Sequence, residues 1–181
     1  MNADQGRRRF LHVCGTLALN AVPPLARAQV ALPQPCRLSL AHTHTGERLE
    51  IAYAEGGAYD PKALGRLNRF LRDHYTGQVG VMDPGLFDQL HQVQALLGCS
   101  GPFEVISGFR CAGTNERLRL QGAGGVARRS LHMDGRAIDV RLPGVPLGEL
   151  RDAALSLRAG GVGFYPREQF VHMDTGRVRH W

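Results

Sequence analysis

The chain has 181 residues, of which 43% are hydrophobic and 21% charged, which is typical of a globular protein with one ordinary domain. The formal net charge is +6, but the first 28 residues hold four arginines and one aspartate, so the rest keeps only +3. After residue 28 the one pair of adjacent basic residues is Arg128-Arg129. Because the chain has no basic stripe, we do not expect a nucleic-acid partner. The mild positive charge is compatible with binding to an anionic cell wall.

The N-terminus carries the pattern of an export signal. Residues 7–11 (Arg-Arg-Arg-Phe-Leu) fit the twin-arginine pattern, residues 11–22 are weakly apolar, and Ala26-Arg27-Ala28 offers a cleavage site. The apolar stretch is shorter than the roughly 20 residues that span a bilayer. A disordered basic tail would explain the arginines but not the cleavage site. We therefore expect a signal peptide at 1–28, passage through the twin-arginine translocase, and a periplasmic domain at 29–181 with no stable membrane insertion.

The mature chain begins with a predicted hairpin. Residues 37–41 and 49–53 have strand character and flank a turn at 45–47, so residues 29–57 form an N-terminal hairpin ahead of a core at 58–181.

The core combines helices and short strands. Asp60-Pro61 begins a helix that Thr76-Gly77 ends, and Asp83-Pro84 begins a second helix that ends at Gly98. The remaining predicted elements are a strand at 103–106, a brief helix at 114–120, a loop at 122–125, a strand at 137–142, a helix at 147–157 and strands near 162–165, 170–173 and 177–181. This order predicts an α+β fold, with a small, mostly antiparallel sheet and helices on one side, rather than alternating βαβ units.

Three cysteines remain after the signal segment. Either Cys99 and Cys111 pair in the oxidising periplasm, or these two and Cys36 are buried small residues. Their spacing matches no metal site, and no catalytic role is assigned to them.

The residues from Ser130 to Asp139 form the clearest candidate site. His132 and Asp139 bracket Gly135, which permits a tight turn, and a second strand carries His172. Two imidazoles and a carboxylate suit Zn²⁺ and leave its fourth position to a water that the ion activates. Taken singly, Asp139 is equally consistent with a strand-end cap and His172 with a core histidine.

Several motifs in one order resemble a known family. The stretch from Ser130 to Asp139 resembles the Ser-x-His-x-x-Gly-x-Ala-x-Asp motif of the D-alanyl-D-alanine carboxypeptidase and murein endopeptidase zinc peptidases, whose fold the hedgehog signalling domain shares. Further segments resemble their twin-arginine-exported murein endopeptidase K branch, over nearly the whole mature chain. These segments are residues 44–47, 68–74, 106–110, 160–163 and 170–177.

The resemblance implies roles for single residues. The positions of the family's zinc ligands match His132, Asp139 and His172. Arg110 matches an arginine that lies near the bound peptide in relatives, where it can stabilise an oxyanion. Alternatively, Arg110 forms a structural ion pair. Asp174 shares a strand face with His172, so it is either the general base or a partner that orients a ligand.

Other positions stay open. Some relatives carry a carboxylate three residues before the last histidine ligand, where this chain has Gln169, and Glu168 and Asp134 are fallback bases. His42 and His44 are consistent with metal ligands on one strand face or with a role in the turn.

The sequence and the resemblance together imply two alternative functions. The first is a periplasmic zinc peptidase that hydrolyses peptide cross-links or stem peptides of peptidoglycan, between two diaminopimelate residues or between D-Ala and diaminopimelate. The second is a metal-containing peptidoglycan-binding module without turnover, which the glutamine at position 169 favours.

Overall fold

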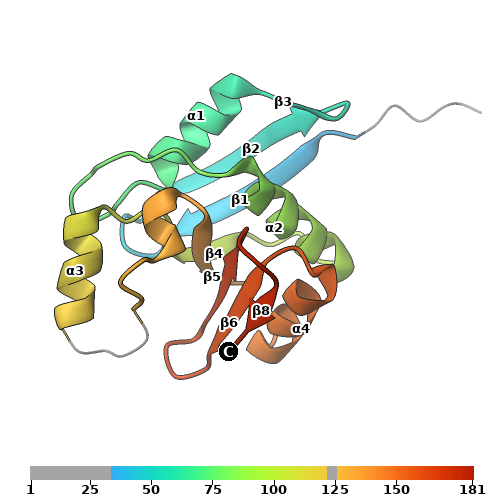
Figure 1. Cartoon of the computed structure of the whole chain (residues 1–181). Helices are drawn as coiled ribbons and strands as arrows, with labels where there is room; N and C mark the ends of the chain where they lie inside the picture. The colour runs from blue at the N-terminus through green and yellow to red at the C-terminus, as the bar shows by residue number, and fades with distance from the viewer. Residues whose placement is uncertain (1–33, 122–125) are drawn as a thin grey trace, which may run out of the picture. The chain divides into compact units, whose positions relative to one another are not determined.

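The structure is a computed structural model that describes residues 34–121 and 126–181; the expected signal peptide and the loop at 122–125 lie outside the described residues. Eight strands in this part of the chain form one sheet in the order β3-β2-β1-β4-β5-β7-β6-β8 (Figure 1). The strands are β1 (Cys36–His42), β2 (Arg48–Glu55), β3 (Ala58–Tyr59), β4 (Phe103–Ser107), β5 (Ala137–Arg141), β6 (Gly161–Tyr165), β7 (Phe170–Asp174) and β8 (Arg179–His180). The helices are α1 (Pro61–Phe70), α2 (Pro84–Leu96), α3 (Ala112–Leu120), the 3₁₀ helix η1 (Leu131–Asp134) and α4 (Leu147–Leu157).

Most of the strand pairs are antiparallel, as the sequence predicts. The parallel exceptions are β1 with β4 and β6 with β8. Because β1 pairs with both β2 and β4, the N-terminal hairpin is continuous with the sheet of the core. Strand β3 has only two residues and was not predicted.

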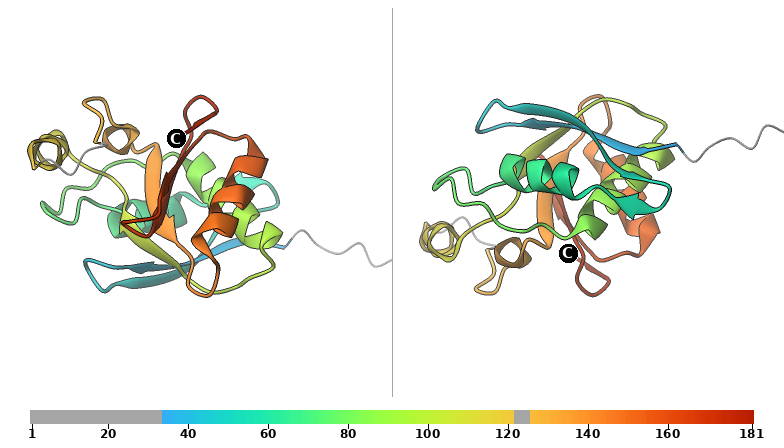
Figure 2. Two further views of the ribbon diagram at one scale, coloured as in Figure 1. Left: turned by 90° about the horizontal axis from the view of Figure 1, so that it is seen from below. Right: turned by 90° about the horizontal axis from the view of Figure 1, so that it is seen from above.

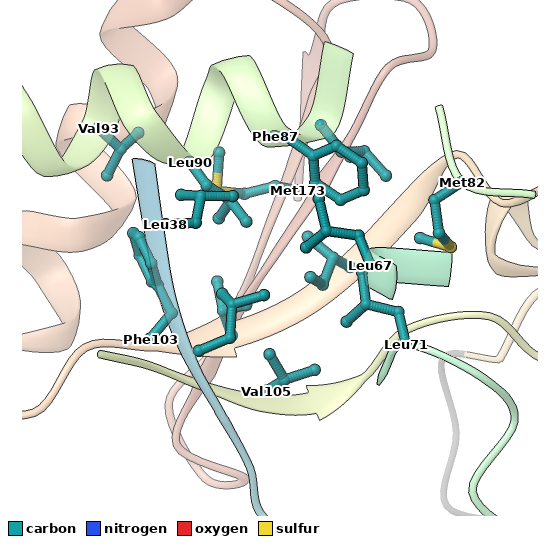
Figure 3. Packing of buried hydrophobic residues seen from close by; sticks show 14 of the residues in the cluster. Leu38, Leu67, Leu71, Met82, Phe87, Leu90, Val93, Phe103, Val105 and Met173 are labelled. Atoms are coloured by element: carbon teal, nitrogen blue, oxygen red, sulfur yellow. The ribbon is translucent and has the colours of Figure 1, made fainter. Parts of the chain in front are cut away.

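The helices α1, α2 and α4 pack on the strands, where they contact β2, β1 and the β6–β7 pair respectively (Figure 2). Figure 3 shows part of the core between them, with Leu67 of α1, Leu90 of α2 and Val105 of β4 among its buried side chains. Full burial of one such side chain contributes about 1.5–3 kcal/mol. The expectation of an α+β fold with helices on one side is therefore confirmed for these three helices, while α3 stands at one end of the sheet (Figure 1).

Strand alternation assigns the two faces of the central strands. Ile138 and Val140 of β5, like Val171 and Met173 of β7, belong to the hydrophobic core. The residues between them, which include Asp139 and His172, therefore point to the opposite face. This face of β5 and β7 carries the candidate site.

Helices α1, α2 and α4 start where the sequence predicts, α3 starts at Ala112 rather than at Thr114, and α1 ends earlier than predicted. The Asp60 carboxylate accepts a hydrogen bond from the Lys62 N–H, at the predicted start of α1. Helix α1 ends at Phe70 rather than near Thr76, because the Asp73 carboxylate accepts hydrogen bonds from the N–H groups of Tyr75 and Thr76. These local bonds compete with helix formation.

Candidate metal centre

The two strand-borne members of the site lie directly opposite each other. Asp139 of β5 and His172 of β7 are paired in register, so their side chains project from the same face of the sheet. Both are almost completely buried, with 3% and 8% of their surfaces exposed.

The third member, His132, comes from the 3₁₀ helix η1. The Ser130 hydroxyl accepts a hydrogen bond from the His132 N–H at the start of η1, and Gly135 ends it with a φ of 67°. A side chain at Gly135 would overlap the carbonyl oxygen of Val81, so both the conformation and the packing require glycine. This turn holds His132, which is 2% exposed, over the strands.

Three potential ligand atoms converge at this point. His132 Nε2 lies 3.2 Å from Asp139 Oδ1 and 3.3 Å from His172 Nδ1, and the Asp139 and His172 atoms are 2.8 Å apart. Among the described residues this is the only set of three histidine, cysteine or acidic donors that gathers within 4.8 Å. Two imidazole nitrogens and one carboxylate oxygen fit Zn²⁺ by the chemistry of the donor set.

The second nitrogen of each imidazole has a fixed partner. His132 Nδ1 lies 2.7 Å from the Gly108 carbonyl oxygen, which can only accept, so Nδ1 carries the proton and Nε2 keeps its lone pair for the site. His172 Nε2 lies 3.2 Å from Asp174 Oδ2, which leaves Nδ1 directed at Asp139 and His132. Such contacts select the tautomer that a metal ligand needs.

The charges of the site favour a cation. Burial lowers the pKa of His132. Burial also opposes ionisation of Asp139, but the neighbouring His132 and His172 outweigh it and hold the pKa of this carboxyl below its usual range. At His172, burial is outweighed by hydrogen bonds to Asp139 and Asp174, which raise its pKa to about 9. The ionised Asp139 carboxylate therefore gives the site the negative charge that favours a cation.

Arg110 binds Asp139, one of the three converging residues, directly. Its Nη2 donates to Asp139 Oδ2 at 2.5 Å, and its Nε donates to the Ser107 hydroxyl at 2.8 Å. Asp139 therefore faces the imidazoles with one oxygen and Arg110 with the other. The guanidinium also lines the cleft beside the site.

Asp174 lies behind His172. Its carboxylate is fully buried and accepts hydrogen bonds from the N–H groups of Gly161 and Gly176 and from the guanidinium of Arg179. Burial opposes ionisation, yet these bonds and His172 together lower its pKa. The carboxylate contacts the ring nitrogen that faces away from the converging atoms.

A cleft of about 230 Å³ opens over His132, Asp139 and His172. Of the fallback bases, Glu168 lines this cleft, whereas Asp134 is exposed on η1 and does not. Gln169 has a φ of 59° in the β6–β7 turn and lines a different hollow, beside Arg141. The remaining lining residues are Arg110, Val126, Ala127, Arg129, Ser130, Leu131, Tyr165, Phe170, Arg179 and Trp181.

His42 and His44 do not belong to the site. Their rings contact each other and His74, with centroids 4.2–6.1 Å apart, but these three residues do not gather three donor atoms as the main site does. His42 Nδ1 accepts a hydrogen bond from the His44 N–H, which favours the role in the turn.

The cysteines at 36, 99 and 111 are free thiols in this structure. All three are partly buried, and Cys36 and Cys99 pack against the core. The arrangement agrees with small buried residues rather than with a Cys99–Cys111 disulfide.

Sequence reasoning gave no site role to Arg179 and Trp181, which line the cleft. The signal that could have found them is their spacing from His172, because a strand-like segment at 177–181 that follows a ligand strand can return to it. Their side chains contact Asp174 and His172.

No helix among residues 34–121 and 126–181 combines the length and the apolar character needed to cross a membrane.

Comparisons with known proteins show which family the chain belongs to. Residues 30–181 match the family described as peptidoglycan L,D-endopeptidase MepK. The chain is 44% identical to the peptidoglycan L,D-endopeptidase MepK of Escherichia coli (strain K12), with 100% of both chains covered. It is 42% identical to the "Probable peptidoglycan L,D-endopeptidase MepK" of Haemophilus influenzae, over 98% of this chain and 96% of the relative. No solved structure matches the chain significantly.

Proposed function

Because the chain belongs to the peptidoglycan L,D-endopeptidase MepK family, we propose that it is a zinc-dependent murein endopeptidase that hydrolyses peptide cross-links of peptidoglycan. The observation that carries the zinc dependence is the convergence of two imidazole nitrogens and one carboxylate oxygen at the floor of a cleft. We also propose that its fold is related to that of the D-alanyl-D-alanine peptidases and the hedgehog domain. The motif from Ser130 to Asp139 supports this relationship.

His132, Asp139 and His172 would hold the ion. When bound, Zn²⁺ supplies a Lewis acid that polarises an amide carbonyl and makes water acidic enough to be a nucleophile near neutral pH. The Gly108 carbonyl and Asp174 hold the outward protons of His132 and His172, so that each ring offers its other nitrogen to the ion. Burial limits the solvent around the three side chains, while the cleft leaves one side of the site open to water and substrate.

Arg110 and Asp174 serve the site in different ways. Arg110 holds Asp139 through Oδ2 and lines the cleft, where its guanidinium can meet a substrate carbonyl or carboxylate. For Asp174, its position behind His172 and its full burial favour the orienting role over that of a general base.

The substrate follows from the family. Its relatives carry the name L,D-endopeptidase, which favours the bond between two diaminopimelate residues over the D-Ala–diaminopimelate bond. The cleft offers charges of both signs, at Arg129 and Glu168, to such a polar, charged peptide.

The site of action is the periplasm. The pattern at residues 7–11 and the cleavage site at 26–28 support export through the twin-arginine translocase. Cell fractionation tests this: replacement of Arg7 and Arg8 by lysine should leave the unprocessed chain in the cytoplasm, and unchanged periplasmic recovery would contradict it.

Digestion of intact sacculi by the purified protein, with muropeptides separated by chromatography and identified by mass, tests the activity. We expect new products from cleavage between diaminopimelate residues, and their loss, together with loss of zinc measured by elemental analysis, in His132→Ala and His172→Ala. His91→Ala, outside the cleft, is the matched control. Retained binding to sacculi without any product would instead favour the non-catalytic binding module.

A further inference from the structure

The C-terminal segment lies against the ligand His172. Strand β8 pairs in parallel with β6, which in turn pairs with β7, so Arg179 and the residue Trp181 after β8 come close to the ligand strand. Both side chains line the cleft, and neither contacts His132 or Asp139 through any hydrogen bond or ion pair found among the described residues.

Arg179 clamps the carboxylate behind His172. Its Nη2 donates to Asp174 Oδ2 at 2.7 Å and its Nη1 donates to Asp174 Oδ1 at 3.2 Å. The same Oδ2 lies 3.2 Å from His172 Nε2. A two-pronged contact of this kind fixes the plane of a carboxylate, and here it fixes the atom to which His172 donates.

Trp181 covers the ring itself. Its centroid lies 5.3 Å from that of His172, at an interplanar angle of 50°. The indole is held by a 2.8 Å hydrogen bond from Nε1 to the Tyr165 hydroxyl and by the Arg179 guanidinium, 4.9 Å from the ring centroid. The indole therefore limits rotation of the imidazole toward it.

Two glycines on one face of β6 make this arrangement possible. A Cβ at Gly163, the cross-strand partner of His172, would lie 2.7 Å from Trp181 Cε2. A Cβ at Gly161 would lie 2.5 Å from Arg179 Nη1 and would overlap the Asp174 carboxylate. Because side chains two apart on a strand share a face, the pair clears one continuous space for Asp174, Arg179 and Trp181.

We infer that Arg179 and Trp181 are positioning residues for the metal ligand His172: Arg179 fixes it through Asp174, and Trp181 fixes it by direct packing. The inference rests on the proposed zinc site and assigns it two residues that bind no metal. Without them, the ring of His172 can adopt more orientations. Zinc binding is then weaker, because the ring loses this freedom when the three ligands bind the ion.

The test measures zinc affinity by competition with a chromophoric chelator, and ligand geometry by the visible absorption of the Co²⁺-substituted protein. Arg179→Gln and Trp181→Ala should each weaken zinc binding about 10–100-fold and alter the cobalt bands. Arg179→Lys, which restores a cation beside Asp174, should recover part of the affinity. Arg177→Gln removes an exposed arginine two residues away and should match the wild type.

Circular dichroism and thermal unfolding of the metal-free variants separate positioning from loss of fold. If Trp181→Ala does not fold, Trp181→Phe carries the test, because it keeps an aromatic ring beside Gly163 but loses the bond to Tyr165. Variants that fold, bind zinc as the wild type does and leave the cobalt spectrum unchanged would overturn the inference and leave the proposed function standing. A wild-type chain that binds no zinc would overturn both.

Discussion

Asp139 Oδ1 and His172 Nδ1 lie 2.8 Å apart, and the two residues are direct cross-strand partners of β5 and β7. Two of the three converging donors are therefore placed by the register of the sheet. The third, His132, depends on the short η1 turn, which Gly135 ends. The stability of that turn decides whether the donor set is complete.

Gly135→Ala should destabilise the protein by more than about 1–3 kcal/mol, because a left-handed backbone conformation becomes unfavourable and the new Cβ overlaps a backbone oxygen of Val81. Thermal unfolding measures the loss. Gly144→Ala is the matched control, since Gly144 also has a positive φ, of 83°, but has no atom within 4 Å of the added Cβ. Equal losses in the two variants would show that the contact with Val81 is unimportant.

Asp174→Asn should weaken zinc binding about 10–100-fold, because an amide holds the His172 proton less firmly than a carboxylate does. Turnover should largely return at saturating zinc. Affinity and turnover on purified muropeptides are measured separately, and Glu168→Gln, which alters the other cleft carboxylate, is measured beside it. Normal zinc affinity with lost turnover in Asp174→Asn would make Asp174 the general base; the same result in Glu168→Gln would assign that role to Glu168.

Arg110→Gln should lower kcat by about 10²–10³ at saturating zinc, the usual effect of removing a donor that stabilises an oxyanion. Arg110→Lys should be impaired as well, because an ammonium group does not reproduce the planar fork that meets Ser107 and Asp139 together. Arg66→Gln, at an exposed position of α1, is the control. A change in zinc affinity alone, with kcat intact, would reduce Arg110 to an ion pair that holds Asp139.

His42 should make the fold sensitive to acid. Burial, and then the nearby His74, His44 and Arg72, lower its pKa to about 4, against the opposing charge of Glu47. Between pH 6.5 and 4 the unfolded chain therefore binds a proton that the folded chain does not, so the free energy of unfolding falls as the pH falls through this window.

Urea unfolding of the wild type and of His42→Asn measures this effect. The wild type should lose on the order of 1–2 kcal/mol more than the variant between pH 6.5 and 4. His180→Asn, at an exposed histidine, should follow the wild type. Parallel curves for the wild type and His42→Asn would show that His42 is not the acid-sensitive group.

Much of the fold could be predicted because its signals are local. Asp60 and Asp83 cap α1 and α2 as their sequence contexts indicate, and alternation in β5 and β7 marks the strands. The end of α1 was placed too late because local hydrogen bonds from Tyr75 and Thr76 to Asp73 compete with the helix. The other oxygen of Asp73 accepts a hydrogen bond from Cys111, which is 38 residues away. No local pattern shows such a contact.

The sequence by itself determined most of the element types, the family and the three residues that converge in the site, because the motif from Ser130 to Asp139 and the strand around His172 mark these residues. Only the tertiary structure decided what surrounds them: that Asp174 lies behind His172, that Arg110 binds Asp139, and that Arg179 and Trp181 return along β8 to the strand of His172. These relationships depend on strand register and on which way each side chain turns. Both are set by packing between segments that are distant along the chain.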